Sequence, residues 1–132
     1  MKVSSYASPA FRLTLLGFTA SVQAGGFLSS CTSIGYYPSL GDKPVGASCR
    51  TSDGHYLYSE ANTMSYIGNI NGILKAHSGG YGASCQNCGV NPSNPSLYYL
   101  ICQCNGPNGW ATTHIDLNLY LSNKNGNLAW DP

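Results

Sequence analysis

Four side chains in the 132-residue sequence could together perform acid–base chemistry, namely Arg50, His55, Glu60 and His114. Histidine and glutamate are common general acids and bases, so a small secreted ribonuclease-like enzyme is one hypothesis. An internal repeat, described below, places Trp110 opposite His55 and His114 opposite Glu60. This pattern is typical of a variable surface and not of one assembled site, so we predict a protein without catalytic residues.

The six cysteines are the other reactive side chains, and they allow two different chemistries. Their even number, together with the secretory leader described below, predicts three disulfides. The alternative is a zinc site, because Cys85-x-x-Cys88 and Cys102-x-Cys104 could supply four thiolates. A secreted protein meets oxidant before it meets free zinc, so we predict disulfides, no bound metal and no cofactor. The six are Cys31, Cys49, Cys85, Cys88, Cys102 and Cys104.

Residues 1–24 have the order of features found in a secretory signal peptide. Lys2 and Arg12 supply positive charge, an apolar run follows over 13–22, and Val22-Gln23-Ala24 has the small-x-small form of a cleavage site. The apolar run is much shorter than the ~20 residues that span a bilayer. We therefore predict a cleaved signal peptide over 1–24 and a secreted, extracellular domain over 25–132, with no membrane attachment after cleavage.

Charged residues are scarce, at 8% of the chain against roughly 25% in an average soluble protein. Removal of 1–24 leaves four basic and five acidic residues, a net charge of −1. So few Lys and Arg exclude a nucleic-acid binder that neutralises phosphates. The 42% of hydrophobic residues argue against disorder. The composition predicts a folded, nearly neutral protein.

The chain repeats itself with an offset of 54 residues. Phe27 then falls on Tyr81, Cys31 on Cys85, and Asn69 on Asn123, and the middle of each repeat matches at an offset of 55. We predict one repeat over about 26–77 and another over about 81–132. Because equivalent cysteines should pair equivalently, the bridges are Cys31–Cys49 and Cys85–Cys104. Cys88–Cys102 is then a second bridge across the same antiparallel hairpin.

The local pattern is mostly β. Residues 45–49 and 100–104 alternate, which predicts inward faces made of Val45, Ala47 and Cys49 in one repeat and Leu100, Cys102 and Cys104 in the other. Four Asx-Gly pairs predict hairpin turns at 53–54, 71–72, 108–109 and 125–126. The apolar spacing over 62–67 and 116–121 suits single helical turns, with Ser59 or Thr113 available as caps. A Gly/Ser-rich connector over 76–82 joins the repeats.

The second repeat resembles the signature of the cyanovirin-N homology family. The matching residues are Ile115-Asp116-Leu117-Asn118, Asn123, Asn125-Gly126 and Leu128-Ala-Trp130. The first repeat resembles it more loosely, since Ala61-Asn62, Met64 and Ala76 replace signature residues. The resemblance covers 26–132. It implies an all-β, elongated, pseudo-symmetric two-repeat fold with strand exchange between the repeats and short 3₁₀ turns, here with three disulfides.

The resemblance also implies a function, which is non-catalytic lectin binding of mannose-type oligosaccharides or glycoproteins at one or both ends. Sugars are arrays of neutral hydroxyls, and Asn, Ser and backbone groups can hydrogen-bond them without ionic chemistry. We expect a monomer. A domain-swapped dimer stays open, because the repeats of this family already exchange strands.

Two composite sites follow from the resemblance. The first comprises Ser29, Ser30, Arg50, Ser52, Asp53, Asn123, Lys124 and Asn125. The second, expected to be weaker because glycines replace polar residues in it, comprises Asn69, Ile70, Asn71, Gly79, Gly80, Ser84, Asn105 and Asn108.

Structural roles are the alternative for several of these residues. Asn71 and Asn125 suit type I′ turns, and Asn69 and Asn123 could simply bond their own backbone. The pairs Tyr36-Tyr37 and Tyr98-Tyr99 could stack on sugars, although strand alternation predicts that one tyrosine of each pair lies in the core.

Overall fold

The computed structural model describes residues 25–94 and 96–132, so the predicted signal peptide lies outside the described residues. Ten strands and three short 3₁₀ helices make up this described part. The first repeat forms η1 (Phe27–Ser29), β1 (Cys31–Tyr36), β2 (Val45–Arg50), β3 (Tyr56–Ala61), β4 (Ile67–Ile70) and β5 (Ile73–Ala76). The second forms η2 (Tyr81–Ala83), β6 (Cys85–Asn94), β7 (Leu97–Gly106), β8 (Gly109–Asp116), η3 (Leu117–Leu119), β9 (Leu121–Lys124) and β10 (Asn127–Trp130). Within these ranges there is no helix long and apolar enough to cross a membrane.

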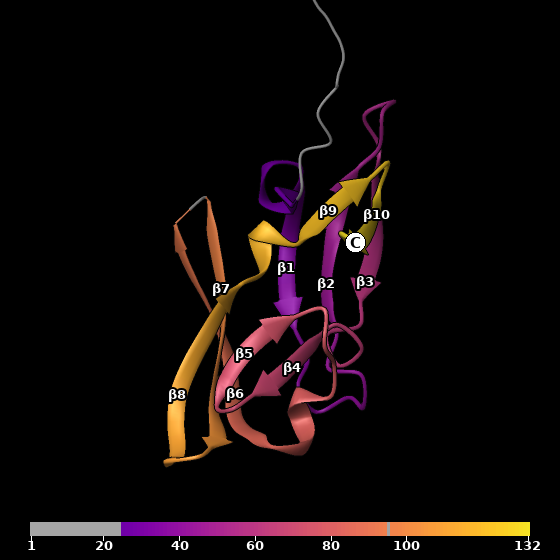
Figure 1. The fold of residues 1–132 in the computed structure, drawn as a ribbon. Helices are drawn as coiled ribbons and strands as arrows, with labels where there is room; N and C mark the ends of the chain where they lie inside the picture. The colour runs from indigo at the N-terminus through magenta and orange to yellow at the C-terminus, as the bar shows by residue number, and fades with distance from the viewer. Residues whose placement is uncertain (1–24, 95) are drawn as a thin grey trace, which may run out of the picture.

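The strands form two halves, and each half contains parts of both repeats (Figure 1). The antiparallel sheet β1–β2–β3 of the first repeat packs against the hairpin β9–β10 of the second. The sheet β6–β7–β8 of the second repeat packs in the same way against the hairpin β4–β5 of the first. The predicted all-β, pseudo-symmetric fold with strand exchange between repeats is therefore confirmed.

Ser59 and Thr113, which the sequence offered as helix caps, instead tie the exchanged hairpins to the sheets. Ser59 Oγ accepts a hydrogen bond from the backbone nitrogen of Leu128 at 2.9 Å. Thr113 Oγ1 accepts one from Leu74 at 3.2 Å. The expectation was wrong because both residues lie inside strands, β3 and β8, and not at the start of a turn.

The turns over 62–66 and 117–119 are capped by other residues, Asn62 and Asp116, each of which lies three positions after the expected cap. Asn62 Oδ1 accepts from the backbone nitrogen of Ser65 at 3.1 Å, and Asp116 Oδ1 accepts from Asn118 at 3.0 Å. Side-chain oxygens of this kind satisfy a backbone donor that a short turn leaves free. Asp116 thus begins η3, while 62–66 forms a hydrogen-bonded turn without a helix.

The structure contains the three predicted disulfides, Cys31–Cys49, Cys85–Cys104 and Cys88–Cys102. All six cysteines lie in the described residues and all are paired, which overturns the zinc alternative. The first two bridges join directly paired positions of β1–β2 and β6–β7. Closing loops of 18, 19 and 14 residues, each bridge contributes about 3 kcal/mol in the chain-entropy account.

The core runs through both halves and has the predicted inward faces. Val45, Ala47 and Cys49 are buried on β2, as are Leu100, Cys102 and Cys104 on β7. The repeat-equivalent aromatics Phe27 and Tyr81 are completely buried. Burial on this scale supplies the main favourable contribution to folding, because removing apolar surface from water is favourable.

Two hydroxyl groups satisfy the buried Tyr81 side chain. Its hydroxyl lies 2.7 Å from Thr63 Oγ1 and 2.8 Å from the hydroxyl of Tyr36. Burial, the largest cause, raises the pKa of both tyrosines. Tyr98 is buried edge-on against Phe27, with ring centroids 5.8 Å apart. One tyrosine of each predicted pair is thus more buried, while Tyr37 is exposed.

The four Asx-Gly pairs form turns of two kinds. In the hairpins β4–β5 and β9–β10 both turn residues have positive φ, 55° and 89° at Asn71-Gly72 and 53° and 93° at Asn125-Gly126. These are the values of a type I′ turn, in which Asn and Gly are strongly favoured. At 53–54 and 108–109 only the glycine has positive φ, so these connections are built differently.

Candidate carbohydrate site

The side chain of Asn123 joins three segments at the far end of the first half. Its Nδ2 donates to Ser30 Oγ and to the backbone oxygen of Arg50, each at 2.9 Å. Its Oδ1 accepts from the backbone nitrogen of Gly126 at 2.7 Å. Both amide hydrogens are therefore used within the protein, which favours a positioning role for Asn123.

Asn69 makes the equivalent connections in the second half. Its Nδ2 lies 2.9 Å from Ser84 Oγ and 2.9 Å from the backbone oxygen of Asn105. Its Oδ1 accepts from Gly72 at 2.7 Å. Each asparagine therefore links an exchanged hairpin to the sheet of the other repeat, and does not bond only its own turn.

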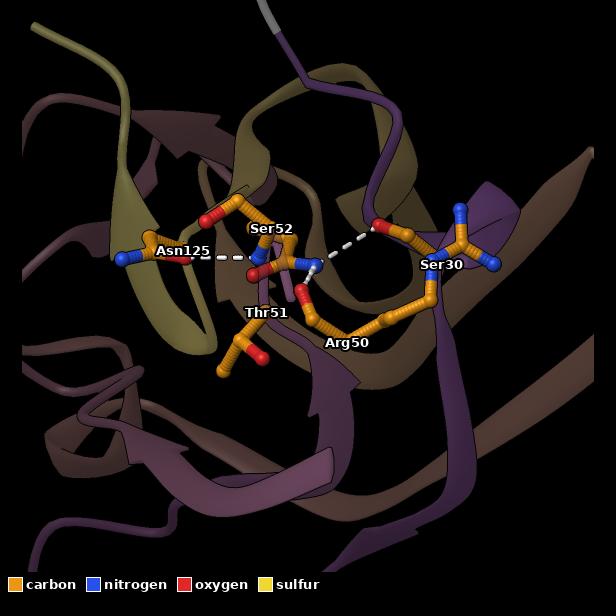
Figure 2. Close-up of a pocket in the computed structure, with 6 residues that line it drawn as sticks. Ser30, Arg50, Thr51, Ser52 and Asn125 are labelled. Carbon is orange, nitrogen blue, oxygen red and sulfur yellow. Dashed lines mark hydrogen bonds between the residues drawn. The ribbon is translucent and has the colours of Figure 1, made fainter. Parts of the chain in front are cut away.

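A hollow of about 470 Å³ lies next to Asn123 (Figure 2). One wall is the turn of the hairpin β9–β10, and the other is the segment that follows β2. Asn125 Oδ1 accepts from the backbone nitrogen of Ser52 at 2.8 Å and holds the two walls together. The residues that line the hollow are Ser30, Arg50, Thr51, Ser52, Asn123 and Asn125.

Arg50 has a fixed backbone and an unengaged side chain. Its backbone nitrogen donates to the backbone oxygen of Ser30 at 2.9 Å, and its oxygen accepts from Asn123. Among the described residues, its guanidinium forms no hydrogen bond and no ion pair. A guanidinium offers five N–H donors in a planar fork, so this group is available to a ligand.

A second hollow of about 410 Å³ adjoins the first across Thr51, Ser52 and Asn125. Asp53 and His55 line it, with Asp53 Oδ1 lying 3.1 Å from His55 Nδ1. The Thr51 hydroxyl also donates to Asp53 Oδ1. This hydrogen bond, the largest cause, and those from His55 hold the pKa of Asp53 below its usual value.

The structure gathers most of the residues predicted for the first site. Ser30, Arg50, Ser52, Asn123 and Asn125 line the first hollow, and Asp53 lines the adjoining one. Ser29 and Lys124 line neither. The Ser29 hydroxyl donates to the backbone oxygen of Gly26 at 2.9 Å, and Lys124 Nζ lies 3.8 Å from Asp131. Thr51 was missed, although its place between two predicted residues could have suggested it.

The hollow found in the second half is smaller, about 260 Å³, and its lining contains the repeat counterparts of Thr51, Ser52, Asp53, Leu57 and Asn125, which line the adjoining hollow of the first half. The β7–β8 connection, part of that lining, lies at the opposite end of the molecule from the tip of β9–β10 (Figure 1). Gly106 and Pro107 stand there in place of Thr51 and Ser52. Pro107 has no N–H, so Asn71 cannot make the bond that Asn125 makes to Ser52. The turn also packs closely on Gly106, where a Cβ would lie 2.8 Å from the Asn71 oxygen.

Two of the eight residues predicted for the second site line this hollow, Asn71 and Asn108. Asn69, Ser84 and Asn105 form the hydrogen-bonded connection described above. The remaining three are Ile70, which is exposed, Gly79, which packs on the backbone of 64–65, and Gly80, which precedes η2.

The four residues of the ribonuclease-like alternative have separate neighbours. His55 pairs with Asp53, and Glu60 accepts from the Tyr58 hydroxyl at 2.8 Å. The His114 ring packs edge-on against Tyr99 in the other sheet, at 4.8 Å. In the described residues, no hydrogen bond or ion pair joins any two of the four candidate side chains.

Three solved structures share this fold of two strand-exchanged halves. Microvirin, solved as a microvirin:mannobiose complex, has 28% sequence identity to this chain. The alignment covers 81% of this chain and 99% of microvirin, with a TM-score of 0.69. The CVNH protein of Gibberella zeae is 21% identical and covers 80% and 97%, with a TM-score of 0.72. A MoCVNH3 variant in complex with (N-GlcNAc)4 is 18% identical and covers 84% and 100%, with a TM-score of 0.70.

The family model described as the CVNH domain matches residues 27–129. The chain therefore belongs to the CVNH family, whose members are carbohydrate-binding lectins and not enzymes. No curated protein sequence matched the chain. The predicted family is confirmed, and a lectin is favoured over the ribonuclease-like alternative.

Proposed function

We propose that the chain is a secreted lectin that binds mannose-type oligosaccharides in the hollow beside Asn123. The observation that carries the proposal is the unengaged guanidinium of Arg50 at the edge of a neutral, polar hollow. Microvirin, which is 28% identical, was solved with mannobiose. Three disulfides in a domain of this size also favour an extracellular protein.

The residues of the hollow would divide the work of binding. The guanidinium of Arg50 can donate to two neighbouring sugar hydroxyls, a geometry that its planar fork suits. Asn125 Nδ2 on the opposite wall and the Ser52 hydroxyl on the same wall as Arg50 add further hydrogen-bonding groups. Asn123 and Ser30 hold both walls in place. A neutral hydrogen bond contributes about 1 kcal/mol net, so one hollow binds a small sugar weakly.

We propose that the second half binds such sugars more weakly or not at all. Its hollow is smaller, and Gly106 and Pro107 remove the hydroxyl-bearing side chains present in the first half. Two sites that engage one branched glycan together raise its overall affinity through effective concentration. A monomeric chain with one effective site lacks this gain.

The proposal is tested by calorimetric titration with mannobiose, comparing the wild-type chain with Arg50→Ala. Loss of charge-assisted hydrogen bonds, which contribute about 1.5–3 kcal/mol, should weaken binding at least tenfold with an unchanged melting temperature. Lys75→Ala removes an exposed cation from the other half and is the matched control. Unchanged affinity in Arg50→Ala would show that the sugar binds elsewhere. A second titration, with tetra-N-acetylglucosamine in place of mannobiose, tests the class of sugar.

A further inference from the structure

A buried carboxylate lies beside the first residue of the described structure. Asp131, which follows β10, is 6% exposed. Ser122 Oγ donates to this carboxylate, whose two oxygens lie at 2.8 and 2.9 Å. The backbone nitrogen of Gly25 donates to the same carboxylate and to Ser122 Oγ, the latter at 3.1 Å. Gly25, Ser122 and Asp131 thus form a closed polar cluster from opposite ends of the chain.

The position of Gly25 in this cluster is set by its own backbone. Its φ is +74°, and a Cβ there would lie 2.2 Å from the backbone oxygen of Asn118. Only glycine fits a positive φ with such close backbone contact. The next residue, Gly26, donates to the same Asn118 oxygen at 2.7 Å. The nitrogen of residue 25 is therefore held against Asp131 by contacts that do not depend on the residues before it.

The charge of Asp131 is poorly matched by the side chains around it. A buried carboxylate is costly unless a positive charge or several donors compensate it. Lys124 Nζ lies 3.8 Å from Asp131 Oδ1, but its side chain is 53% exposed, which describes a loose pair. A peptide N–H at Gly25 supplies a neutral donor. A terminal ammonium at the same point would supply a full positive charge and three donors.

We propose that Gly25, Ser122 and Asp131 form a receptor for the amino terminus produced by cleavage between Ala24 and Gly25. Hydrolysis of this peptide bond consumes one water and leaves a carboxylate on Ala24 and an amine on Gly25, which is protonated at neutral pH. The ammonium then forms a buried ion pair with Asp131. Removal of the leader replaces the neutral peptide donor by a charged one, so that the hydrogen bond to Asp131 becomes an ion pair, and stabilises the fold. The inference does not depend on sugar binding.

Two chains that differ by one residue test this directly, one starting at Gly25 and one at Ala24. Both keep every strand, disulfide and core residue of the structure. The chain that starts at Gly25 should melt about 4 °C higher, because even a modest gain in stability shifts the melting temperature by several degrees in a domain of about 100 residues. Equal melting temperatures would overturn the proposal.

The same pair of chains carrying Asp131→Asn separates the ion pair from other effects of chain length. The difference between the two starting residues should disappear in that background, and a retained difference would contradict the proposed partner. A measurement that needs no variant is the mass of the protein secreted by a host cell from the full 132-residue chain. It should correspond to residues 25–132, and a different first residue would overturn the processing site.

Discussion

Asn123 and Ser30 are 93 residues apart in the chain, yet the amide nitrogen of Asn123 lies 2.9 Å from the Ser30 hydroxyl. The contact exists because the hairpin β9–β10 of the second repeat packs on the sheet of the first. The same amide also holds the backbone of Arg50. Strand exchange between the repeats therefore builds the hollow that we propose as the sugar site.

Asn123→Ala should lower the free energy of unfolding by about 2–3 kcal/mol, because it removes three hydrogen bonds of about 1 kcal/mol each. Chemical denaturation measures this loss. Asn127→Ala is the matched control on the next strand, since the Asn127 side chain forms no hydrogen bond with any described residue. Equal stability of the two variants would show that the connection contributes nothing.

Asn125→Gly should weaken mannobiose binding about five- to tenfold, the value of one hydrogen bond, and lower the free energy of unfolding by no more than about 1 kcal/mol. Glycine adopts the positive φ of this turn, so the hairpin is kept while the Ser52 contact is lost. Asn71→Gly makes the same change in the second half and should leave calorimetric affinity unchanged. A loss of affinity in Asn71→Gly alone would place binding at the opposite end.

Gly106→Ala should destabilise the chain by about 1–3 kcal/mol through overpacking. A Cβ at this position would lie 2.8 Å from the Asn71 oxygen and 2.9 Å from Gly72 Cα, both backbone atoms that cannot yield cheaply. Thermal denaturation compares this variant with Gly89→Ala, where a Cβ meets no atom within 4 Å. A stable Gly106→Ala variant would mean that the second hollow has room to open.

Replacing Cys88 and Cys102 together by serine should cost about 3 kcal/mol of stability without affecting sugar affinity. The Cys85–Cys104 bridge still joins β6 to β7, and the proposed site lies in the other half. Denaturation and calorimetry on the same sample separate the two effects. A parallel loss of affinity would indicate that the two halves are coupled.

The Asp53 carboxyl should titrate below the usual aspartate value of about 3.9, because its hydrogen bonds favour the ionised form. A depressed pKa stabilises the folded chain above the unfolded value, and this contribution is lost as the pH falls through the folded value. Thr51→Val removes the strongest of these hydrogen bonds and should raise the pKa, as followed by NMR. An unchanged pKa in the variant would assign the shift to His55.

The sequence predicts the features that depend on local pattern or on the repeat. The alternation over 45–49 and 100–104, the type I′ turns at Asn71 and Asn125, and the three disulfides could all be inferred in this way. The repeat was decisive for the disulfides, because it reduced the possible pairings of six cysteines to one set.

The features missed by the sequence all depend on contacts between distant segments. Ser59 and Thr113 were expected as caps, but they receive hydrogen bonds from exchanged hairpins. The cluster around Asp131 has no local signal, because it joins residues from opposite ends of the described chain. The hollows of the two halves also differ in how closely the hairpin turn approaches the sheet. The turn at Asn71 packs directly on Gly106, and the matching asparagines Asn71 and Asn125 do not reveal this contact.

The most direct test of the proposed site is titration of ¹⁵N-labelled protein with mannobiose, followed by amide chemical shifts. The account predicts that the largest shifts belong to residues around the first hollow, above all Arg50, Thr51, Ser52 and Asn125. Shifts concentrated at Asn108 and Gly109 of the other half, or no shifts at millimolar sugar, would contradict it.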